Sequence, residues 1–261
     1  MTTFTGVAPL WRYDDFFHLR STFEGVIESN WIATLRGGWN LNARIADAHQ
    51  RFDSASYAGY EVDSAGTAVR FALPHGLYKL WSLSFGGGTP SRALTLGANA
   101  GYSAAPIFAE AAAGRLWSAA ATATWRPTAS VRIEARWVHQ RLARARDGSR
   151  FSTANIPRLK LEYQLTRAIF FRYIGQYFAQ DRDALADPRI ARPILINGSQ
   201  TTAATTNDFR NDILFSYKPT PGTVFFLGYG ASLVEPDAFR FHNLSRQADG
   251  FFLKASYLFR M

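Results

Sequence analysis

Residues 117–126 read Trp-Ser-Ala-Ala-Ala-Thr-Ala-Thr-Trp-Arg, and this stretch decides the fold class. Every second residue from Trp117 to Trp125 is apolar, whereas the alternate positions carry mainly small polar side chains. A period of two is that of a β-strand with two chemically different faces. At about 3.3 Å per residue and a tilt of roughly 40°, eight residues cover ~20 Å, close to the ~25 Å apolar band of a membrane β-barrel. The two tryptophans are therefore expected at the edges of a lipid-facing band, with a sandwich core as the alternative.

Similar alternation recurs along the chain and predicts about eleven strands. Trp31 and Trp39 repeat the eight-residue spacing, whereas 169–178 and 223–231 are apolar on both phases. The expected strands are 16–28, 31–44, 77–86, 93–102, 117–126, 131–140, 157–165, 169–178, 209–218, 223–232 and 251–261.

The connections between these strands alternate between short turns and long polar loops. Bacterial outer-membrane barrels show this alternation, with tight periplasmic turns and longer external loops. The sequence therefore predicts an all-β, antiparallel up-and-down transmembrane β-barrel with about 11 or 12 visible strands, in the outer membrane of a Gram-negative-type bacterium. The expected turns are Ser29-Asn30, 87–90, 127–129, Thr166-Arg167 and 219–222, and the expected loops are 45–76, 103–116, 141–156, 179–208 and 233–250.

Composition limits the classes of function. Of 261 residues, 15% are aromatic, yet the mean hydropathy is −0.14, and no run of about 18 uncharged apolar residues could span a membrane as a helix. The absence of cysteine excludes disulfides and thiolate chemistry. The net charge is +9, but the basic residues are scattered without a nucleic-acid-binding motif, so no nucleic-acid partner is expected.

No catalytic, metal-binding or cofactor-binding constellation stands out in the sequence. The five histidines lack metal-ligand spacing, and there is no nucleophile elbow or phosphate-binding loop. We therefore expect no enzymatic activity and no cofactor. The alternative is an outer-membrane enzyme that acts at the outer rim on lipid or glycan. Such an enzyme would need His, Ser or Asp there; for His139, ring stacking is the favoured role.

Charged residues on the polar phase are expected to face the lumen. On lipid, each Arg or Lys would cost about 2–4 kcal/mol at the midplane. Inside a lumen they either form a plug of cross-strand ion pairs or line a basic pore that favours anions. The expected lumen-facing charges are Arg36, Arg44, Arg132, Glu134, Arg136, Arg158, Lys160, Glu162, Arg172, Arg210 and Lys254.

Two more groups of residues are expected at the membrane surfaces. Loop arginines lie where lipopolysaccharide phosphates would be, which Arg can bind in bidentate fashion; solvated loop charge is the alternative. These are Arg141, Arg144, Arg146 and Arg150. The expected aromatic girdle consists of Trp31, Trp39, Trp117, Trp125, Trp137, Tyr163, Tyr217, Tyr257 and Phe259.

The two ends of the chain carry different signals. Residues 1–15 are expected to form an irregular segment that precedes a barrel domain over 16–261, and the first ten residues lack signal-peptide features. An even-stranded barrel needs another ascending strand upstream, so a fragment with missing upstream sequence is expected. From Phe251 to Phe259, alternate residues are apolar, which resembles the C-terminal signal read by the barrel-assembly machinery, although Met261 replaces the usual terminal aromatic.

Three stretches resemble a known family: Arg158-Leu-Lys-Leu-Glu-Tyr-Gln-Leu-Thr-Arg-Ala-Ile-Phe-Phe-Arg172, Phe215-Ser-Tyr-Lys-Pro-Thr-Pro-Gly-Thr-Val-Phe-Phe-Leu-Gly-Tyr229 and Asp249-Gly-Phe-Phe-Leu-Lys-Ala-Ser-Tyr-Leu-Phe-Arg260. The family is the bacterial domain of unknown function 5916, and the resemblance covers the C-terminal two-thirds of the chain. It implies a secreted protein with an N-terminal carbohydrate-binding module of family 9 type and a C-terminal outer-membrane barrel. Nothing here resembles that module, and the resemblance implies no catalytic residues.

The expected function is a channel or translocation role, or a membrane anchor for a carbohydrate-linked envelope protein. A soluble β-sandwich binding module is an alternative. The expected partners are outer-membrane lipid and lipopolysaccharide, the barrel-assembly machinery, and a glycan bound through a missing upstream module.

Overall fold

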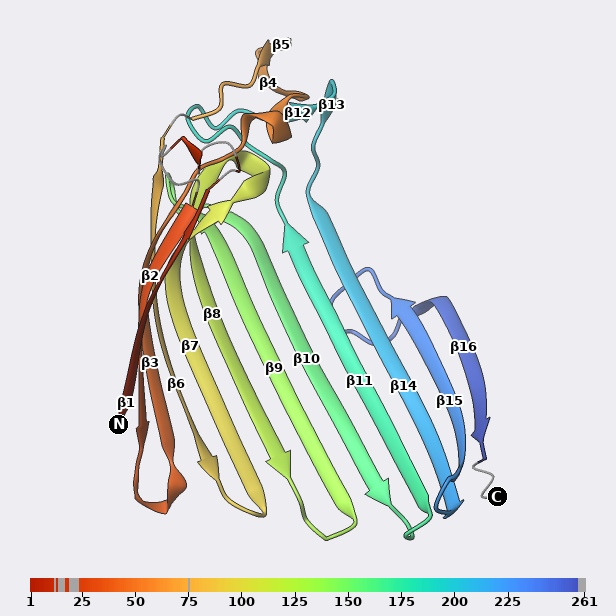
Figure 1. Cartoon of the computed structure of the whole chain (residues 1–261). Helices are drawn as coiled ribbons and strands as arrows, with labels where there is room; N and C mark the ends of the chain where they lie inside the picture. The colour runs from red at the N-terminus through yellow and green to blue at the C-terminus, as the bar shows by residue number, and fades with distance from the viewer. Residues whose placement is uncertain (12, 14–16, 19–23, 75, 258–261) are drawn as a thin grey trace.

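The computed structural model describes residues 1–11, 13, 17–18, 24–74 and 76–257. In this part of the chain, twelve strands form one antiparallel up-and-down sheet (Figure 1), as the alternation predicts. In sheet order they are β1 (Thr2–Leu10), β2 (Glu24–Thr34), β3 (Asn40–Gln50), β6 (Tyr78–Pro90), β7 (Leu94–Ile107), β8 (Ala112–Trp125), β9 (Val131–Arg144), β10 (Arg150–Gln164), β11 (Ile169–Arg182), β14 (Ala204–Thr220), β15 (Thr223–Val234) and β16 (Ser245–Ser256). The two edge strands, β1 and β16, are not paired with each other.

Short turns connect the strands at one end of the sheet, and the long connections gather at the other end (Figure 1). The predicted alternation is therefore confirmed, but the predicted loops are too long. β9 continues to Arg144, and β14 begins at Ala204, because hydrogen-bonded pairing continues past the apolar stretches that marked the strands in the sequence. None of the described helices is long and apolar enough to cross a membrane.

The N-terminal register differs from the prediction. Residues 31–44 do not form one strand, because a turn at 35–39 separates β2 from β3. Gly37 and Gly38 adopt φ angles of 80° and 79°, a left-handed conformation that glycine tolerates and other residues rarely adopt. Ser29-Asn30 lies inside β2 instead, so Trp31 and Trp39 belong to different elements.

Two further expectations are wrong near the ends of strands. The segment 1–15, expected to be irregular, contains strand β1, which pairs along its whole length with β2. The segment 87–90 is the end of β6, and the chain turns at 91–93. A Cβ atom at Gly87 would lie 2.9 Å from the Asn40 carbonyl oxygen, so this glycine permits close strand approach rather than a turn.

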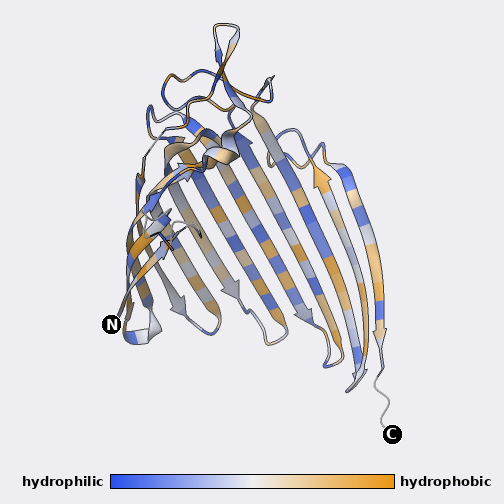
Figure 2. Cartoon of the chain, turned by 45° about the horizontal axis from the view of Figure 1, so that its top comes forward, coloured by the Kyte–Doolittle hydropathy of each residue, from blue (hydrophilic) through white to orange (hydrophobic). Residues whose placement is uncertain are grey.

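The cross-strand register separates two faces of the large sheet, and hydropathy alternates along its strands (Figure 2). We call the face that carries Trp117 and Trp125 the apolar face, and the opposite one the polar face. One row of the apolar face is Trp125, Ile133, Leu161, Tyr173, Ile213 and Tyr229. The adjacent row of the polar face is Thr124, Glu134, Lys160, Ile174, Asp212 and Gly230.

The apolar face is not a protein core. Trp117 is 58% exposed and Trp125 is 49% exposed, and no second sheet packs on this face in the described part of the chain. A sandwich would bury these side chains between two sheets. The sandwich alternative is therefore wrong, and the large apolar surface needs a solvent other than water.

The hydrophobic core lies at the loop end of the sheet. There, β4 (Tyr60–Ser64), β5 (Thr67–Arg70), β12 (Ile194–Ile196) and β13 (Ser199–Gln200) form a small sheet beyond the strand ends (Figure 1). The side chains of Phe52, Tyr57, Val62, Phe71, Ile107, Ala111, Ala112, Phe151, Leu185 and Ile194 bury one another. We call residues 51–74, 76–77, 107–112, 144–151 and 183–203 the cap.

Candidate functional site: a basic row on the polar face

The polar face collects ten of the eleven charges that were expected in a lumen. Arg44, Arg132, Glu134, Arg136, Arg158, Lys160, Glu162, Arg172, Arg210 and Lys254 all lie on it by strand register. Arg36 is the exception, because it belongs to the turn Arg36–Gly38 at the rim of the sheet. Arg44 at the β2 side pairs with Glu28, with Nε 2.9 Å from Oε2.

Four of these charges form a paired cluster on β9 and β10. Arg132 lies 3.3 Å from Glu134 and 3.9 Å from Glu162, and Lys160 lies 2.9 Å from Glu162. Arg132–Glu162 is the one cross-strand pair of these three, and an opposite-charge pair of this kind stabilises a sheet by a few tenths of a kcal/mol up to ~1 kcal/mol. The other two pairs each lie within a single strand, so the predicted cross-strand ladder forms only in part and uses only part of the charge.

The remaining arginines form an unpaired set. Arg136 lies directly opposite Arg158, and Gln176 separates Arg158 from Arg210 in the same cross-strand row. These three arginines are exposed. Neither they nor Arg172 has a carboxylate within 4 Å in the described residues. We call Arg136, Arg158 and Arg210 the basic row.

Two like charges placed directly opposite each other weaken strand pairing, so the basic row has an energetic cost that its neighbours do not relieve. Guanidinium groups in this arrangement present several N–H donors toward any anion that approaches the polar face. The row is therefore the strongest candidate site for an anionic ligand on the large sheet.

Two hollows lie beside this site, each lined mostly by polar-face residues. One, of about 470 Å³, includes Arg172, and the other, of about 490 Å³, includes Arg210; both reach Asp212 and Gly230. In the hollow beside Arg172, Gly250 leaves open space, because a Cβ atom there would meet nothing within 4 Å. The arrangement provides space for small solutes next to two unpaired guanidinium groups.

Aromatic residues mark a level line on the apolar face near the short turns. With strands about 4.8 Å apart and tilted roughly 40°, a line parallel to a membrane shifts by about 1.2 residues per strand relative to a cross-strand row. The strands lean from upper left to lower right in Figure 1. A line parallel to the membrane therefore lies nearer to the short turns on each successive strand from β8 to β16. From Trp125 it reaches Tyr163 on β10 and Tyr217 on β14.

The other residues of the expected girdle are placed differently. Trp31 lies on β2, and Trp39 lies at the end of the turn before β3. Trp137 pairs opposite Ala121, midway between the two tryptophans of β8, and stacks on His139 with ring centroids 5.8 Å apart. That stacking confirms the favoured role of His139, whose Nδ1 is also 2.8 Å from Asn155 Oδ1. Tyr257 is exposed, and Phe259 lies outside the described residues.

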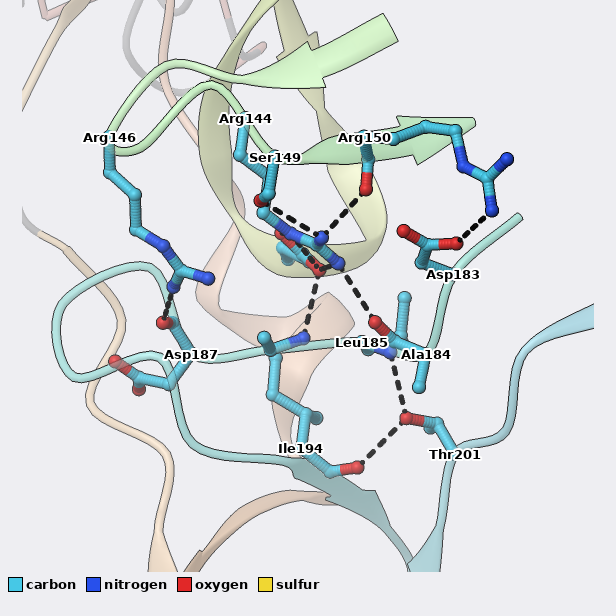
Figure 3. Close-up of polar contacts among 12 residues, drawn as sticks. Arg144, Arg146, Ser149, Arg150, Asp183, Ala184, Leu185, Asp187, Ile194 and Thr201 are labelled. Atoms are coloured by element: carbon cyan, nitrogen blue, oxygen red, sulfur yellow. Dashed lines mark hydrogen bonds and ion pairs between the residues drawn. The ribbon is translucent and has the colours of Figure 1, made fainter. Parts of the chain in front are cut away.

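The loop arginines do not act as one surface patch. Arg144 is only 6% exposed and binds the fully buried Glu110, with Nη2 2.6 Å from Oε1. Arg144 also donates to the carbonyl groups of Arg150 and Ala184, at 2.9 and 2.8 Å (Figure 3). The expectation that Arg144 contacts lipopolysaccharide is therefore wrong, because every part of its guanidinium group is used inside the cap.

The three other loop arginines remain at the surface. Arg141 is exposed, Arg146 bonds to Asp147 and the Asp187 carbonyl, and Arg150 pairs with Asp183 at 2.9 Å. Within the cap, the side-chain hydrogen bonds of Asp147 with Ser149 and Arg146 hold the pKa of that carboxyl well below its usual range. Burial raises the pKa of Tyr57 in the cap core to about 12.

Sequence reasoning missed three buried carboxylates, Glu110, Asp187 and Glu235. Glu110 accepts hydrogen bonds from Arg144 and from the Ala186 N–H, and it is the sole acidic residue of the expected loop 103–116. That isolation, beside the arginine-rich segment 141–150, is a signal that could have suggested the pair. Glu235 accepts from Tyr177 and from the Phe241 N–H, and no sequence motif marks this contact.

In the described part of the chain, no group of three or more His, Asp or Glu side chains could hold a metal ion. The arrangement offers no cluster for general acid–base or nucleophilic chemistry among the polar-face charges, which are mainly guanidinium groups that stay protonated. The guanidinium groups of this face can bind or guide anions.

No family model matches the chain, and no curated protein matches it. Among solved structures, OmpT of Vibrio cholerae is similar at 12% identity, with a TM-score of 0.40, over 90% of this chain and 88% of that chain. In-vitro folded OmpT of the same organism gives 9% identity and a TM-score of 0.39 over 91% and 89% of the two chains. The NanC porin gives 10% identity and a TM-score of 0.34 over 91% and 94%. At these values, nothing about function follows from the similarity.

Proposed function

We propose that the chain spans the bacterial outer membrane as a β-barrel, with the apolar face toward lipid and the polar face around a passage that favours anions. Support for a membrane comes from the exposed apolar face, on whose large side chains no second sheet packs within the described ranges of the chain. Placing the polar face on lipid instead would cost about 2–4 kcal/mol for each Arg or Lys near the midplane. The orientation therefore follows from the charges.

Closure of the sheet is the second element of the proposal. β1 ascends from the short-turn end and β16 descends toward it (Figure 1), so the two edges are antiparallel and can pair. Both edges are almost fully exposed, and unpaired backbone groups in lipid cost several kcal/mol each. Pairing of β1 with β16 gives twelve strands, an even number with both strand ends on the turn side, as in bacterial barrels.

Because the chain has no cysteine, paired cysteines can test closure directly. Thr5→Cys on β1 would be combined with a cysteine at Phe251, Leu253 or Ala255 on β16, which all lie on the apolar face. A monomeric disulfide from one of these combinations in lipid vesicles supports closure within one chain. Disulfides formed only between two chains would contradict it.

The observation that carries the anion preference is the basic row. Among the residues that the structure describes, Arg136, Arg158 and Arg210 have no carboxylate partner, whereas their neighbours Arg132 and Lys160 do. A plug or an anchor has no use for uncompensated charge that weakens strand pairing. A passage does, because a row of positive charges lowers the energy of anions inside the passage and raises the energy of cations there.

A second candidate function is an anchor or platform for a glycan-binding module. The observation that favours it is the cap, a packed core with its own small sheet that lies beyond the ends of the membrane strands (Figure 1). Membership of the domain of unknown function 5916 family, with its carbohydrate-binding module, is part of this alternative. An anchor would conduct no ions.

Ion conductance in planar bilayers tests the proposal. We expect steps from the refolded chain whose reversal potential in a salt gradient shows preference for anions. Replacing Arg136, Arg158 and Arg210 together by glutamine should move the reversal potential toward zero. The matched control, Arg167→Gln, lies in the short turn between β10 and β11 and should have no such effect. A folded, inserted and silent protein would favour the platform; cation-preferring steps would contradict the basic passage.

A further inference from the structure

The connection 235–244, between β15 and β16, folds onto the apolar face rather than across the polar face. Phe239 and Phe241 contact Tyr177, with ring centroids 4.4 and 5.3 Å apart, and Phe241 also contacts Phe209 at 5.9 Å. Tyr177 and Phe209 are register partners on the apolar face, one position from Gln176 and Arg210 of the polar face. The connection therefore lies on the surface that would meet lipid.

A buried hydrogen-bond network fixes this conformation. The Tyr177 hydroxyl donates to Glu235 and accepts from the Phe239 N–H, and the second Glu235 oxygen accepts from the Phe241 N–H at 2.8 Å. Phe239 and Phe241 have φ angles of 62° and 57°, which cost about 1–3 kcal/mol each for non-glycine residues. Despite their ring contacts, Phe239 is still 41% exposed and Phe241 is 52% exposed. Two strained residues thus hold apolar rings at the surface instead of burying them.

These rings stand level with the other aromatic residues at the loop end of the apolar face. Trp81, Tyr102 and Trp117 form a chain of ring contacts across β6, β7 and β8, with centroids 5.4 and 5.2 Å apart. The cross-strand row of Trp117 meets β11 at Asp181 and β14 at Thr205. A shift of about 1.2 residues per strand brings the level line to Tyr177 and Phe209, which is where the connection sits.

A charged residue separates the two phenylalanines. Arg240 is exposed and has no carboxylate within 4 Å in the described residues, and His242 and Asp237 are also exposed. Phe241 also lines an apolar groove of about 850 Å³ together with Trp137, Leu159, Tyr177 and Phe209; Arg136 and Arg158 belong to the same lining, and Arg240 does not. Exposed rings on both sides of an exposed guanidinium group match a molecule with a hydrocarbon chain and an anionic head.

We propose that residues 235–244 dock on the outer-leaflet lipid, with Phe239 and Phe241 among the acyl chains and Arg240 on a lipid phosphate. This inference rests on the proposed orientation of the apolar face. The rings complete the aromatic belt where β11 and β14 carry polar residues at their loop ends, and Arg240 supplies the charge that phosphate binds. Asp237 lies three residues before Arg240, and its negative charge opposes a general attraction of the connection to anions. Binding of a lipid phosphate would therefore depend on the contact with Arg240 itself.

The absence of cysteine allows a nitroxide label to be placed at one position at a time in vesicles of phosphatidylcholine with phosphatidylglycerol. Phe241→Cys should be more accessible to oxygen than to a water-soluble nickel complex, like Leu227→Cys on the apolar face. If Leu227→Cys is lipid-exposed and Phe241→Cys is water-exposed, the docking proposal is overturned. If both are water-exposed, the proposed membrane orientation itself has failed.

Thermal unfolding gives the second readout. Phosphatidylglycerol should raise the Tm of the wild type relative to phosphatidylcholine alone, and Arg240→Gln should lose most of that rise. Arg192→Gln, a change of an exposed cap residue, should keep it. An equal rise for Arg240→Gln, or the same rise from free inorganic phosphate, would overturn binding to a lipid phosphate.

Discussion

Arg144 in the cap and Arg158 on the polar face use the same side chain in opposite ways. Arg144 is buried, binds Glu110 and donates to two carbonyl groups. Arg158 is exposed, faces Arg136 and has no acidic partner in the described chain. A buried charge must be satisfied for the protein to fold, whereas an exposed unpaired charge adds nothing to folding. The difference separates the arginine that maintains structure from those available for function.

The largest effect is expected from Glu110→Ala. Removing one partner of a buried ion pair leaves the other charge unsatisfied and costs about 3–5 kcal/mol. Unfolding of the cap should become measurable by faster hydrogen exchange across 183–203. Asp183→Ala, which breaks the exposed pair with Arg150, is the matched control and should change stability by at most ~1 kcal/mol. An equal loss of stability in Glu110→Ala and Asp183→Ala would contradict the difference between the buried and the exposed ion pair.

A smaller but still large effect should follow from Ile194→Ala in the cap core. Ile194 is 0% exposed, and truncation of a buried isoleucine costs about 2–5 kcal/mol. Ile213→Ala is the control on the apolar face, where the side chain is 49% exposed. Denaturation in lipid vesicles should show a clearly larger loss for Ile194→Ala. A larger loss at Ile213 would mean that protein, rather than lipid, covers the apolar face.

On the polar face, Arg158→Gln should affect function and not stability. Because it removes one of two opposed like charges, we expect stability to be unchanged or to rise by a few tenths of a kcal/mol. Anion preference should fall in the same variant, as measured by reversal potential. A destabilisation of 2 kcal/mol or more, on the scale of a lost buried contact, would show that Arg158 has a structural role like that of Arg144.

The smallest effect concerns pH and the connection 235–244. Burial opposes ionisation of Glu235, but hydrogen bonds from Tyr177 and from the N–H groups of Phe241, Arg240 and Phe239 outweigh it and lower its pKa. The stabilisation is therefore present above the ordinary value of 4.5 and is lost as the pH falls through the lower folded value. A spin label at position 238 should become more mobile below that range, and Glu235→Gln should remove the transition.

Most of the large sheet could be predicted from the sequence because most of its strands after β3 have a period-2 signal, although 169–178 of β11 and 223–231 of β15 are apolar on both phases. The N-terminal strands could not be predicted in this way. The sequence of β1 alternates weakly, and Ser29-Asn30 resembles a turn, although the turn lies at Gly37 and Gly38. The basic row was predicted as charge on one face. Its separation into paired and unpaired arginines depends on cross-strand register, and the Glu110–Arg144 pair depends on contacts between distant loops, which local patterns do not encode.

In the proposed barrel, one face of the sheet meets water and the other meets lipid. Cysteine substitutions at successive positions from Arg158 to Tyr163 on β10, made in the cysteine-free chain inserted in vesicles, test it directly. Reaction with a charged, water-soluble thiol reagent should alternate, with positions 158, 160 and 162 reactive and positions 159, 161 and 163 protected. Uniform reactivity along β10, or protection of the even positions instead, would contradict the proposed barrel and its basic passage.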